Sequence, residues 1–332
     1  IRLHSPATVA NLSCGFDILG VCLDAPFDEI EIKKISKKKV ILNSLDSEFS
    51  NIPLSPEKNT GGIPAIKIIN DLALDFGFEI NIKKGIPLYG GLGSSAATAA
   101  GVAYGINVLL KKCLSNDEVV KYALEGEKIS SETPHADNIG PCINGGLVII
   151  KSTNPLKLIN IKTGEYYFSI IHPNVKVSTK EARQLLPLKV KLKDAVKQWG
   201  NIASLVYGFS INDSNLIKSS MVDHIVEPVR SKLIPHFDEI KEYVLKNNAI
   251  GCSISGSGPS IFALSESKQN AVQILSEMQN IYDKYNVKHH GFYSKINNKG
   301  INTLTDFTIT LITPKTKINQ VSNIKRECQN II

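Results

Sequence analysis

Arginine is scarce in this chain of 332 residues. Only four of its 38 basic residues are arginine, at positions 2, 183, 230 and 326, and the other 34 are lysine. Proteins that read nucleic-acid sequence favour arginine, because its planar guanidinium makes bidentate contacts with bases. The formal charge of +7 is carried mainly by scattered lysines. This argues against a specific nucleic-acid partner and leaves weak electrostatic association open.

Paired cysteines and a membrane-spanning run are also missing. The six cysteines form no CxxC pair and have no histidine at ligand spacing, which excludes an obvious zinc site. Scattered thiols suit a reducing compartment, and residues 1–6 lack the pattern of a signal peptide, so we expect a cytoplasmic protein. Residues 85–110 carry no charge but contain six glycines. We interpret them as a turn and a buried helix, with no membrane partner.

The order of strands and helices indicates the fold class. A chain of this length, with 42% hydrophobic residues, is long enough for about two domains of roughly 100–200 residues. The apolar pattern predicts strands at 28–33, 40–45, 78–82, 145–150, 166–172, 249–254, 261–264 and 308–312. It predicts helices at 63–76, 95–112, 116–128, 178–186, 198–208, 214–222, 236–247 and 267–286. This order lacks a regular βαβ rhythm and favours α+β.

Two lysine-rich stretches are interpreted as exposed surface. Residues 33–39 hold five lysines, and we interpret them as the solvated tip of a hairpin between the strands at 28–33 and 40–45. Residues 189–197 have the same character and are expected to lie outside the core.

The most informative motif is the sequence PLYGGLGSSAA at residues 87–97. Its glycines allow a tight turn and close approach of a ligand, and the helix that follows offers unpaired N–H groups and its dipole to an anion. The turn lacks the lysine of a GxxxxGK(S/T) loop. It fits a relaxed dinucleotide fingerprint, but residues 111–117 read as a helix junction where that motif needs an acidic strand end. A plain turn before a core helix stays open.

Three further motifs carry polar groups at turns. Residues 5–17 present Asn11 and Asp17, and Glu127 is followed by His135 and by Asn138. Residues 251–260 repeat the pattern of a strand followed by a glycine- and serine-rich turn. The first motif is equally compatible with an Asn/Asp pair that only stabilises a turn, and the second with the lining of a site or with a capped loop. The third is either a tight turn or a second set of backbone donors for a phosphate.

Together these blocks resemble the three signatures of the GHMP kinase superfamily. Within it, ANLSCGFD at residues 10–17, HADNIGP at 135–141 and STKEAR at 178–183 most resemble the homoserine kinases. The resemblance extends from residue 1 to about 310. It implies a two-domain α+β fold, with a ribosomal-protein-like N-terminal domain at 1–165 and a ferredoxin-like C-terminal domain at 166–312. A polar tail at 313–332 would follow, and the active site would lie between the domains.

The resemblance also implies the ligands, which are ATP, Mg²⁺ and L-homoserine. ATP would contact Asn59, Pro87, Leu88, Tyr89, Gly90, Gly91, Leu92, Gly93, Ser94, Ser95, Ala96, Ala97, Ser257 and Gly258. Mg²⁺ would bind Glu127 and the hydroxyl of Ser94 or Ser95, which suits an ion that takes few protein ligands. Glu127 is preferred to Glu125 because of its spacing from His135. Tyr89 stands where the family often has glycine, so it needs a roomy loop rim or an ordinary backbone angle.

The resemblance assigns the homoserine pocket to Asn11, Asp17, His135, Asn138, Thr179, Arg183 and Arg230. Asp17 would take the ammonium group, and the two arginines would bind the carboxylate through planar forks that lysine cannot supply. In a chain this poor in arginine, either one is less easily explained as generic surface charge. An ordinary ion pair is the structural alternative for each.

The catalytic residues implied are Asn138, Glu127 and Ser95. Some relatives have an aspartate base where this chain has Asn138, and Asp137 is expected to point elsewhere on an extended segment. We therefore expect catalysis by positioning and charge stabilisation, which phosphoryl transfer permits. The expected product, O-phospho-L-homoserine, belongs to threonine biosynthesis. A mevalonate- or shikimate-type kinase and a non-catalytic nucleotide- or RNA-binding protein are the alternatives, and a homodimer is a family-level expectation.

Overall fold

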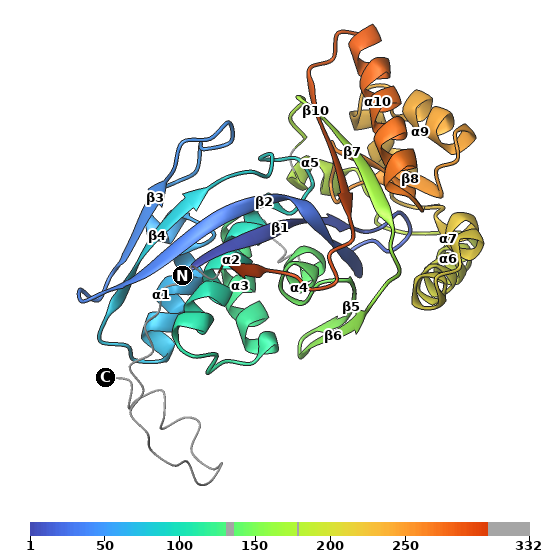
Figure 1. Cartoon of the computed structure of the whole chain (residues 1–332). Helices are drawn as coiled ribbons and strands as arrows, with labels where there is room; N and C mark the ends of the chain where they lie inside the picture. The colour runs from blue at the N-terminus through green and yellow to red at the C-terminus, as the bar shows by residue number, and fades with distance from the viewer. Residues whose placement is uncertain (131–135, 178, 305–332) are drawn as a thin grey trace.

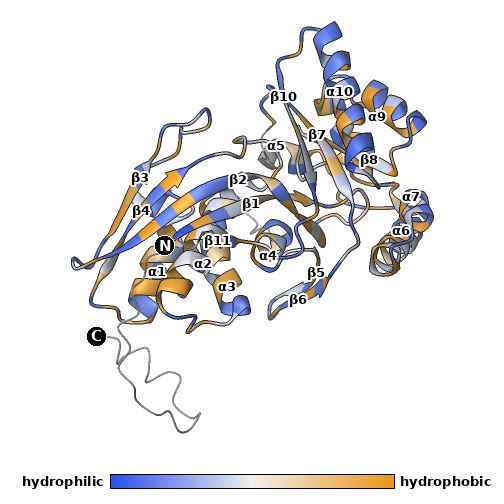
Figure 2. Ribbon diagram, in the orientation of Figure 1, coloured by the Kyte–Doolittle hydropathy of each residue, from blue (hydrophilic) through white to orange (hydrophobic). Residues whose placement is uncertain are grey.

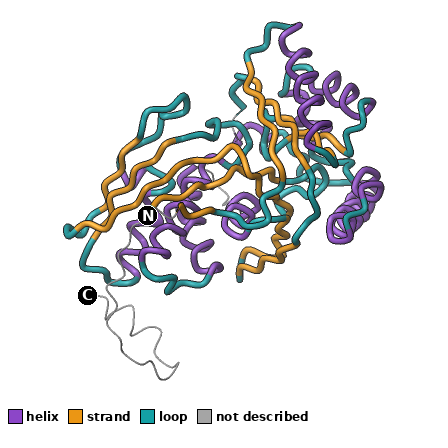
Figure 3. Tube along the Cα trace, viewed as in Figure 1, coloured by secondary structure: helices purple, strands orange, loops and turns teal. Residues whose placement is uncertain are grey.

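The computed structural model describes residues 1–130, 136–177 and 179–304. Two sheets divide the chain, and each packs against its own helices (Figure 1). The helices lie beside the strands and do not alternate with them in a regular βαβ series (Figure 3). The predicted two-domain α+β class is therefore confirmed. No helix among the described residues is long and apolar enough to cross a membrane.

The first sheet is built mainly from the N-terminal half. Its strands are β1 (Arg2–Ala10), β2 (Leu19–Ile35), β3 (Val40–Ser44), β4 (Gly77–Lys83), β5 (Leu147–Thr153), β6 (Leu156–Ile161) and β11 (Asn302–Leu304). The order is β11-β1-β2-β4-β3, and β5 pairs with both β2 and β6. The long β2 pairs with β5 near its start and with β4 near its end. It therefore joins both parts of the sheet.

The predicted hairpin between residues 28 and 45 is wrong in its pairing. β4 lies between β2 and β3, and β3 runs parallel to β4. Phe78, Ile80 and Ile82 of β4 are fully buried, so β4 takes a central position, whereas β3 is only partly buried and forms the edge. Alternating polarity indicates that a strand is half buried but not which strand it pairs with.

Four helices lie on one face of this sheet (Figure 1). They are α1 (Gly62–Asp71), α2 (Ser94–Leu109), α3 (Asn116–Ser130) and α4 (Ala136–Asn144), with a 3₁₀ turn η1 (Pro56–Lys58) before α1. Three of them contact the strands of the sheet, and α3 packs against the other three helices. α2 is built largely from alanine and glycine, and a Cβ atom at Gly101 would approach Ile30 to 2.5 Å. The small residues let α2 lie close to β1 and β2, with its first turn at the glycine-rich loop.

The second sheet has the order β10-β7-β9-β8 and is antiparallel throughout. Its strands are β7 (Tyr167–Pro173), β8 (Gly251–Ile254), β9 (Ile261–Ser265) and β10 (His289–Lys295), and α9 (Phe237–Lys246) and α10 (Lys268–Lys284) pack against it. This is the βαββαβ arrangement of ferredoxin-like folds. The helical connection from β7 to β8 also contains α5 (Thr179–Gln184), α6 (Leu192–Ile211), α7 (Ser214–Ser220), α8 (Glu227–Arg230) and the 3₁₀ turn η2 (Ser231–Leu233).

Several predicted boundaries change. α6 starts at Leu192, so part of the stretch expected only as exposed surface is helical, and α1 ends at Asp71 instead of residue 76. The strand predicted at 308–312 lies outside the described residues. After β10 the chain returns to the first sheet, where β11 pairs with β1. The domain limits 1–165 and 166–312 stay a prediction.

The hydrophobic core continues across both halves. Its larger part joins the first sheet and α1–α4, and it extends to Phe168, Phe209 and Phe262 of the second half. A smaller core lies between the second sheet and α9 and α10. The strands of the first sheet alternate between hydrophobic and hydrophilic residues (Figure 2), as expected for one buried face. The continuous packing holds the two halves around the cavity described next.

Candidate active site

A cavity of about 470 Å³ is lined by residues from both halves of the chain. Most of the predicted site residues line it: Asn11, Asp17, Asn59, Leu88, Tyr89, Gly90, Gly91, Gly93, Ser94, Ser95, Ala96, Glu127, Asn138, Arg183, Arg230 and Ser257. Four do not: Pro87, Leu92, Ala97 and Gly258. Leu92 and Ala97 are buried beneath the loop, because a loop that turns over a helix end must also bury some side chains. His135 and the side chain of Thr179 lie outside the described residues.

The glycine-rich loop ends on the first turn of α2. Gly91 and Gly93 have φ angles of +71° and +67°, a region that L side chains adopt at a cost. A Cβ atom at Gly91 would lie 2.2 Å from the carbonyl oxygen of Ser255. Gly93 is the N-cap of α2 and lines the cavity with Ser95. The N–H groups that an α-helix leaves unpaired are therefore placed beside the cavity.

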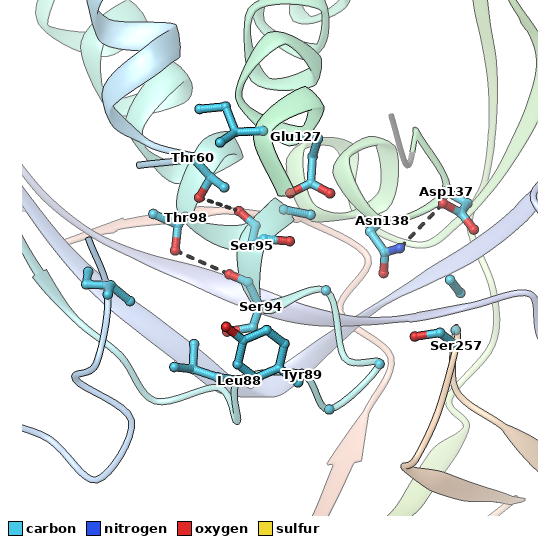
Figure 4. A pocket seen from close by; sticks show the side chains of 18 of the residues that line it. Thr60, Leu88, Tyr89, Ser94, Ser95, Thr98, Glu127, Asp137, Asn138 and Ser257 are labelled. Carbon is cyan, nitrogen blue, oxygen red and sulfur yellow. Dashed lines mark hydrogen bonds between the residues drawn. The ribbon is translucent and has the colours of Figure 1, made fainter. Parts of the chain in front are cut away.

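The structure shows how Tyr89 fits at a position where the family often has glycine. Its φ angle is +57°, so it holds the left-handed conformation that glycine would otherwise supply. The residue is 69% exposed and lines the cavity (Figure 4). The side chain therefore has room, and the backbone carries the strain.

The second glycine- and serine-rich turn supports the first loop. The Ser255 hydroxyl donates to the carbonyl of Gly91 at 2.7 Å, and the Ser260 N–H donates to the carbonyl of Gly90 at 3.3 Å. The N–H of Gly258 donates to the Ser255 carbonyl within the turn, and Gly258 does not line the cavity. Ser257 does line it (Figure 4). The turn mainly holds the loop in place.

A buried ion pair that the sequence did not reveal anchors the same helix end. The ammonium of Lys84 contacts the carboxylate of Asp28 and donates to the Ser94 carbonyl at 2.8 Å and to the Thr98 hydroxyl at 2.9 Å. The Asp28 carboxylate also accepts the N–H groups of residues 85 and 86. Lys84 is the last charged residue before the uncharged run 85–110. This position is the sequence feature that could have indicated its role.

Glu127 faces the first turn of α2. It is 2% exposed, and its carboxylate points toward Ser95 (Figure 4). The Ser94 hydroxyl instead donates to the carbonyl of Ile86 at 3.1 Å. The competing Glu125 pairs with Lys128 at the surface. The structure therefore places the Glu127 carboxylate facing Ser95, and both residues line the cavity (Figure 4).

Asn138 and Asp137 both line the cavity (Figure 4). The Thr8 hydroxyl donates to Oδ1 of Asn138 at 2.7 Å, and Nδ2 of Asn138 donates to Asp137 at 3.4 Å. The expectation that Asp137 points elsewhere is wrong, because residues 136–144 form helix α4 rather than an extended segment. Burial, with the charges of Asp17 and Glu127, raises the pKa of Asp137 to about 7.

The far end of the cavity carries opposite charges. The Arg183 guanidinium donates to both carboxylate oxygens of Asp17 at 3.0 Å. Both side chains are about one-third exposed. The Asn11 side chain accepts the Asp17 N–H at 3.0 Å and donates to the Gly256 carbonyl at 2.8 Å. Asn11 thus ties this end to the second glycine- and serine-rich turn.

Arg230 lies beside this pair and is 3% exposed. Its guanidinium donates to the carbonyls of Ala182 and Gly256 at 3.2 and 3.1 Å. Burial lowers its pKa to about 10, and the nearby Arg183 acts in the same direction. The two guanidinium carbons lie 5.4 and 5.0 Å from the ring centre of Phe16, within cation–π range. The ring, which the sequence did not single out, helps to gather two like charges.

Two side-chain amides near the site, one predicted from the sequence and one not, form hydrogen bonds within the protein. Asn59 is buried, donates to the Pro53 carbonyl at 2.6 Å and accepts the Gly61 N–H at 2.8 Å, so its amide shapes the loop before α1. Gln198 of α6, which the sequence did not indicate, donates to the Cys14 carbonyl and to Asp223 at 2.8 and 2.9 Å. Gln198 thereby joins α6 to the loop that carries Asp17.

Comparisons with known proteins identify the family of the chain. Residues 63–146 match the family described as "GHMP kinases N terminal domain", and residues 205–284 match "GHMP kinases C terminal". A homoserine kinase of Chlorobium phaeovibrioides is 39% identical over 317 residues, covering 92% of this chain and 99% of the relative. One of Methanococcus vannielii is 38% identical over 284 residues, covering 85% and 93%.

Solved structures of GHMP kinases are also similar to this chain. The homoserine kinase from Cytophaga hutchinsonii is 44% identical, with a TM-score of 0.87 over 91% of this chain and 96% of that one. A mevalonate kinase is 20% identical, with a TM-score of 0.68 over 90% of this chain and all of that one, and this likeness shows the fold alone. The chain belongs to the GHMP kinase superfamily and, within it, to the homoserine kinases.

Proposed function

We propose that this chain transfers the γ-phosphoryl group of ATP to the side-chain hydroxyl of L-homoserine, giving ADP and O-phospho-L-homoserine in threonine biosynthesis. The observation that carries the proposal is one cavity with two unlike ends. A glycine-rich helix N-terminus forms one end, and the pair of Asp17 and Arg183 forms the other. An anion suits the first end, and a zwitterion suits the second. We also propose a cytoplasmic location, which the scattered thiols support.

The nucleotide phosphates are assigned to the loop and the first turn of α2. Backbone N–H groups there act with the helix dipole, so no lysine in the loop is needed. The buried Lys84 holds the Ser94 carbonyl and thereby keeps this turn in place. Ser257 would contact the nucleotide from the opposite rim.

Glu127 and Ser95 are suited to a magnesium ion. Mg²⁺ prefers oxygen ligands and usually takes one or two from the protein, with phosphates and water completing its octahedron. Among the residues that the structure describes, no cluster of three or more His, Cys, Asp or Glu side chains is placed to hold a metal. When bound, the ion would neutralise charge on the phosphate oxygens.

L-Homoserine is assigned to the charged end. We propose that its ammonium takes the place of Arg183 against Asp17, while its carboxylate takes the place of Asp17 against Arg183. Charge is conserved in this exchange, so neither side chain is left unpaired when substrate enters. Arg230, held by two backbone carbonyls, would supply a second fork to the carboxylate.

Asn138 is assigned to the reacting hydroxyl. Thr8 fixes the orientation of its amide, so Asn138 can position the hydroxyl oxygen for in-line attack on the γ-phosphorus. The bond from that phosphorus to the ADP oxygen breaks, and the hydroxyl proton passes late to phosphate or solvent. Asp137 offers another acceptor in the same cavity. If Asn138→Ala kept full turnover while Asp137→Asn abolished it, the positioning account would be wrong.

A phosphorylation panel tests the proposed function. The chain is given saturating Mg-ATP with homoserine, mevalonate, shikimate or galactose in parallel, and the release of ADP is measured. We expect rapid turnover with homoserine alone. Turnover with mevalonate or shikimate only would favour another GHMP kinase. Binding of Mg-ATP without product, together with salt-sensitive RNA binding, would favour a non-catalytic protein.

A further inference from the structure

The loop between β1 and β2, residues 11–18, is held in a costly backbone conformation. Asn11, Leu12 and Ser13 have φ angles of +71°, +44° and +70°, and Asp17 has a φ angle of +60°. L side chains adopt this left-handed region at a cost, so it persists where the surrounding structure enforces it. The Ser13 hydroxyl is also buried and has no hydrogen-bond partner among the residues that the structure describes. The loop that carries Asp17 therefore needs support from outside itself.

Gln198 of α6 gives this support from the second half of the chain. Gln198 is 5% exposed, and its Nε2 donates to the carbonyl of Cys14 at 2.8 Å. Cys14 is 1% exposed and lies in the middle of the loop. A buried carbonyl that loses its donor is destabilising. The bond therefore favours the loop conformation in which the Cys14 carbonyl faces α6.

The same amide is bound to the segment that leads to Arg230. Nε2 of Gln198 also donates to the carboxylate of Asp223 at 2.9 Å, and Oε1 accepts the N–H of His224 at 2.9 Å. Asp223 is buried, and its carboxylate accepts the N–H groups of residues 225–227 at 2.9, 3.0 and 2.9 Å. Asp223 thereby fixes the turn into α8, whose last residue is Arg230.

Gln198 therefore links two elements that meet at the charged end of the cavity. One is the loop with Asp17, which pairs with Arg183 at 3.0 Å, and the other is α8 with Arg230. Burial lowers the pKa of Arg230 to about 10, and the Asp223 carboxylate opposes that shift. Three hydrogen bonds made by one buried amide hold the loop and the turn against the same helix.

We propose that Gln198 is a positioning residue for the charged end of the cavity. Its amide sets the distance between Asp17 and Arg230, and thereby the fit of a small zwitterion that contacts both. Gln198 does not line the cavity, so it acts on a ligand only through the loop and α8. The inference deepens the proposed function and rests on it for the identity of the zwitterion, which is L-homoserine.

The first test replaces the amide with an apolar side chain of similar length. Gln198→Met removes all three hydrogen bonds, and we expect KM for homoserine to rise about tenfold, with kcat and KM for ATP changed less than about twofold. A variant that had merely lost folded protein would lower kcat and leave both KM values unchanged. Gln273→Met changes an exposed glutamine of α10 and is the matched control, which should behave like the unchanged chain.

The second test needs no substrate and uses Cys14 as a reporter within the loop. Burial raises the pKa of the Cys14 thiol to about 12, and the nearby Asp223 acts in the same direction, so the thiol should react slowly while the loop is held. With iodoacetamide under native conditions, we expect Gln198→Met to label Cys14 about tenfold faster, as measured by peptide mass spectrometry. Cys142 and Cys252 are buried elsewhere and should keep their rates.

Gln198→Asn is a second variant that keeps the amide and shortens the side chain by one methylene, so we expect smaller changes in the same direction. Unchanged labelling of Cys14 in both variants, or equal acceleration at Cys14, Cys142 and Cys252, would overturn the proposal. An unchanged KM for homoserine, or an equal rise in both KM values, would overturn it too. If the unchanged chain does not phosphorylate homoserine, the proposed function fails, and faster labelling of Cys14 alone would still show that Gln198 holds the loop.

Discussion

The two ends of the cavity present different kinds of chemical group. At the end assigned to the nucleotide, the groups that face the cavity include the glycine-rich loop, whose shape depends on Gly91 and Gly93. At the end assigned to homoserine, they include the charged side chains of Asp17, Arg183 and Arg230. The first end presents dipoles and the second presents full charges that partly cancel.

Because of this difference, the two ends are sensitive to different kinds of change. Backbone donors keep their protonation state, so the nucleotide end is sensitive to shape and to any added Cβ atom. Side-chain charges tolerate small shifts of the backbone but depend on pH, on fork geometry and on their partners. A substitution that changes the shape of the first end should therefore act differently from one that changes the charges of the second.

The largest effect is expected at Gly91. Gly91→Ala places a Cβ atom 2.2 Å from the Ser255 carbonyl oxygen at a positive φ, and we expect kcat/KM for ATP to fall about 100-fold or more. Gly90→Ala is the matched control, because its nearest neighbours lie at 3.3 Å, and it should lose about tenfold or less. Steady-state kinetics check both. Equal losses in the two variants would show that the turn geometry is not the cause.

A smaller effect, confined to the other substrate, is expected at Arg183. Arg183→Lys keeps the charge but removes the planar fork, so we expect KM for homoserine to rise about 10- to 100-fold with KM for ATP nearly unchanged. Arg2→Lys is the control, since Arg2 pairs with Glu31 at the surface. A parallel rise in both KM values would remove the distinction between the two ends.

The smallest effect concerns stability and pH. The folded-state pKa of Asp137 is raised to about 7, so between about pH 4 and pH 7 the folded chain holds a proton that the unfolded chain has lost. Stability from this group therefore falls as pH rises through that window. When the pH is raised from 5 to 8, we expect the unfolding free energy of the wild type to fall by about 1–2 kcal/mol more than that of Asp137→Asn.

Denaturant unfolding at the two pH values checks this, with Asp75→Asn, an exposed aspartate, as the control. If the wild type and Asp137→Asn differed by the same amount at both pH values, the raised pKa would be contradicted.

Local features of the sequence were predictable where a turn or a helix end decides the structure. The glycine-rich loop and the helix after it are examples. Glu127 lines the cavity and Glu125 pairs with Lys128 at the surface, while the role of Glu127 stays a prediction. The scarcity of arginine pointed to Arg183 and Arg230, both of which line the cavity. In each case, the residue type and its near neighbours carry the information.

The features that were missed depend on contacts between distant parts of the chain. Lys84 meets Asp28 across 56 residues, and Gln198 meets Cys14 across 184. β4 comes between β2 and β3 because of burial in the whole sheet. Asp137 lines the cavity because α4 forms under the sheet, where local sequence suggested an extended segment. No periodicity in the sequence reports such partners.

The most direct test of the two-ended cavity compares L-homoserine with its decarboxylated analogue aminopropanol, in the wild type and in Arg183→Lys. If the arginine fork binds the carboxylate, the wild type should lose about 100-fold or more in kcat/KM on removal of that group. The variant, which has already lost the fork, should lose far less. Equal losses in both enzymes would contradict the account, because Arg183 would then act on something other than the substrate carboxylate.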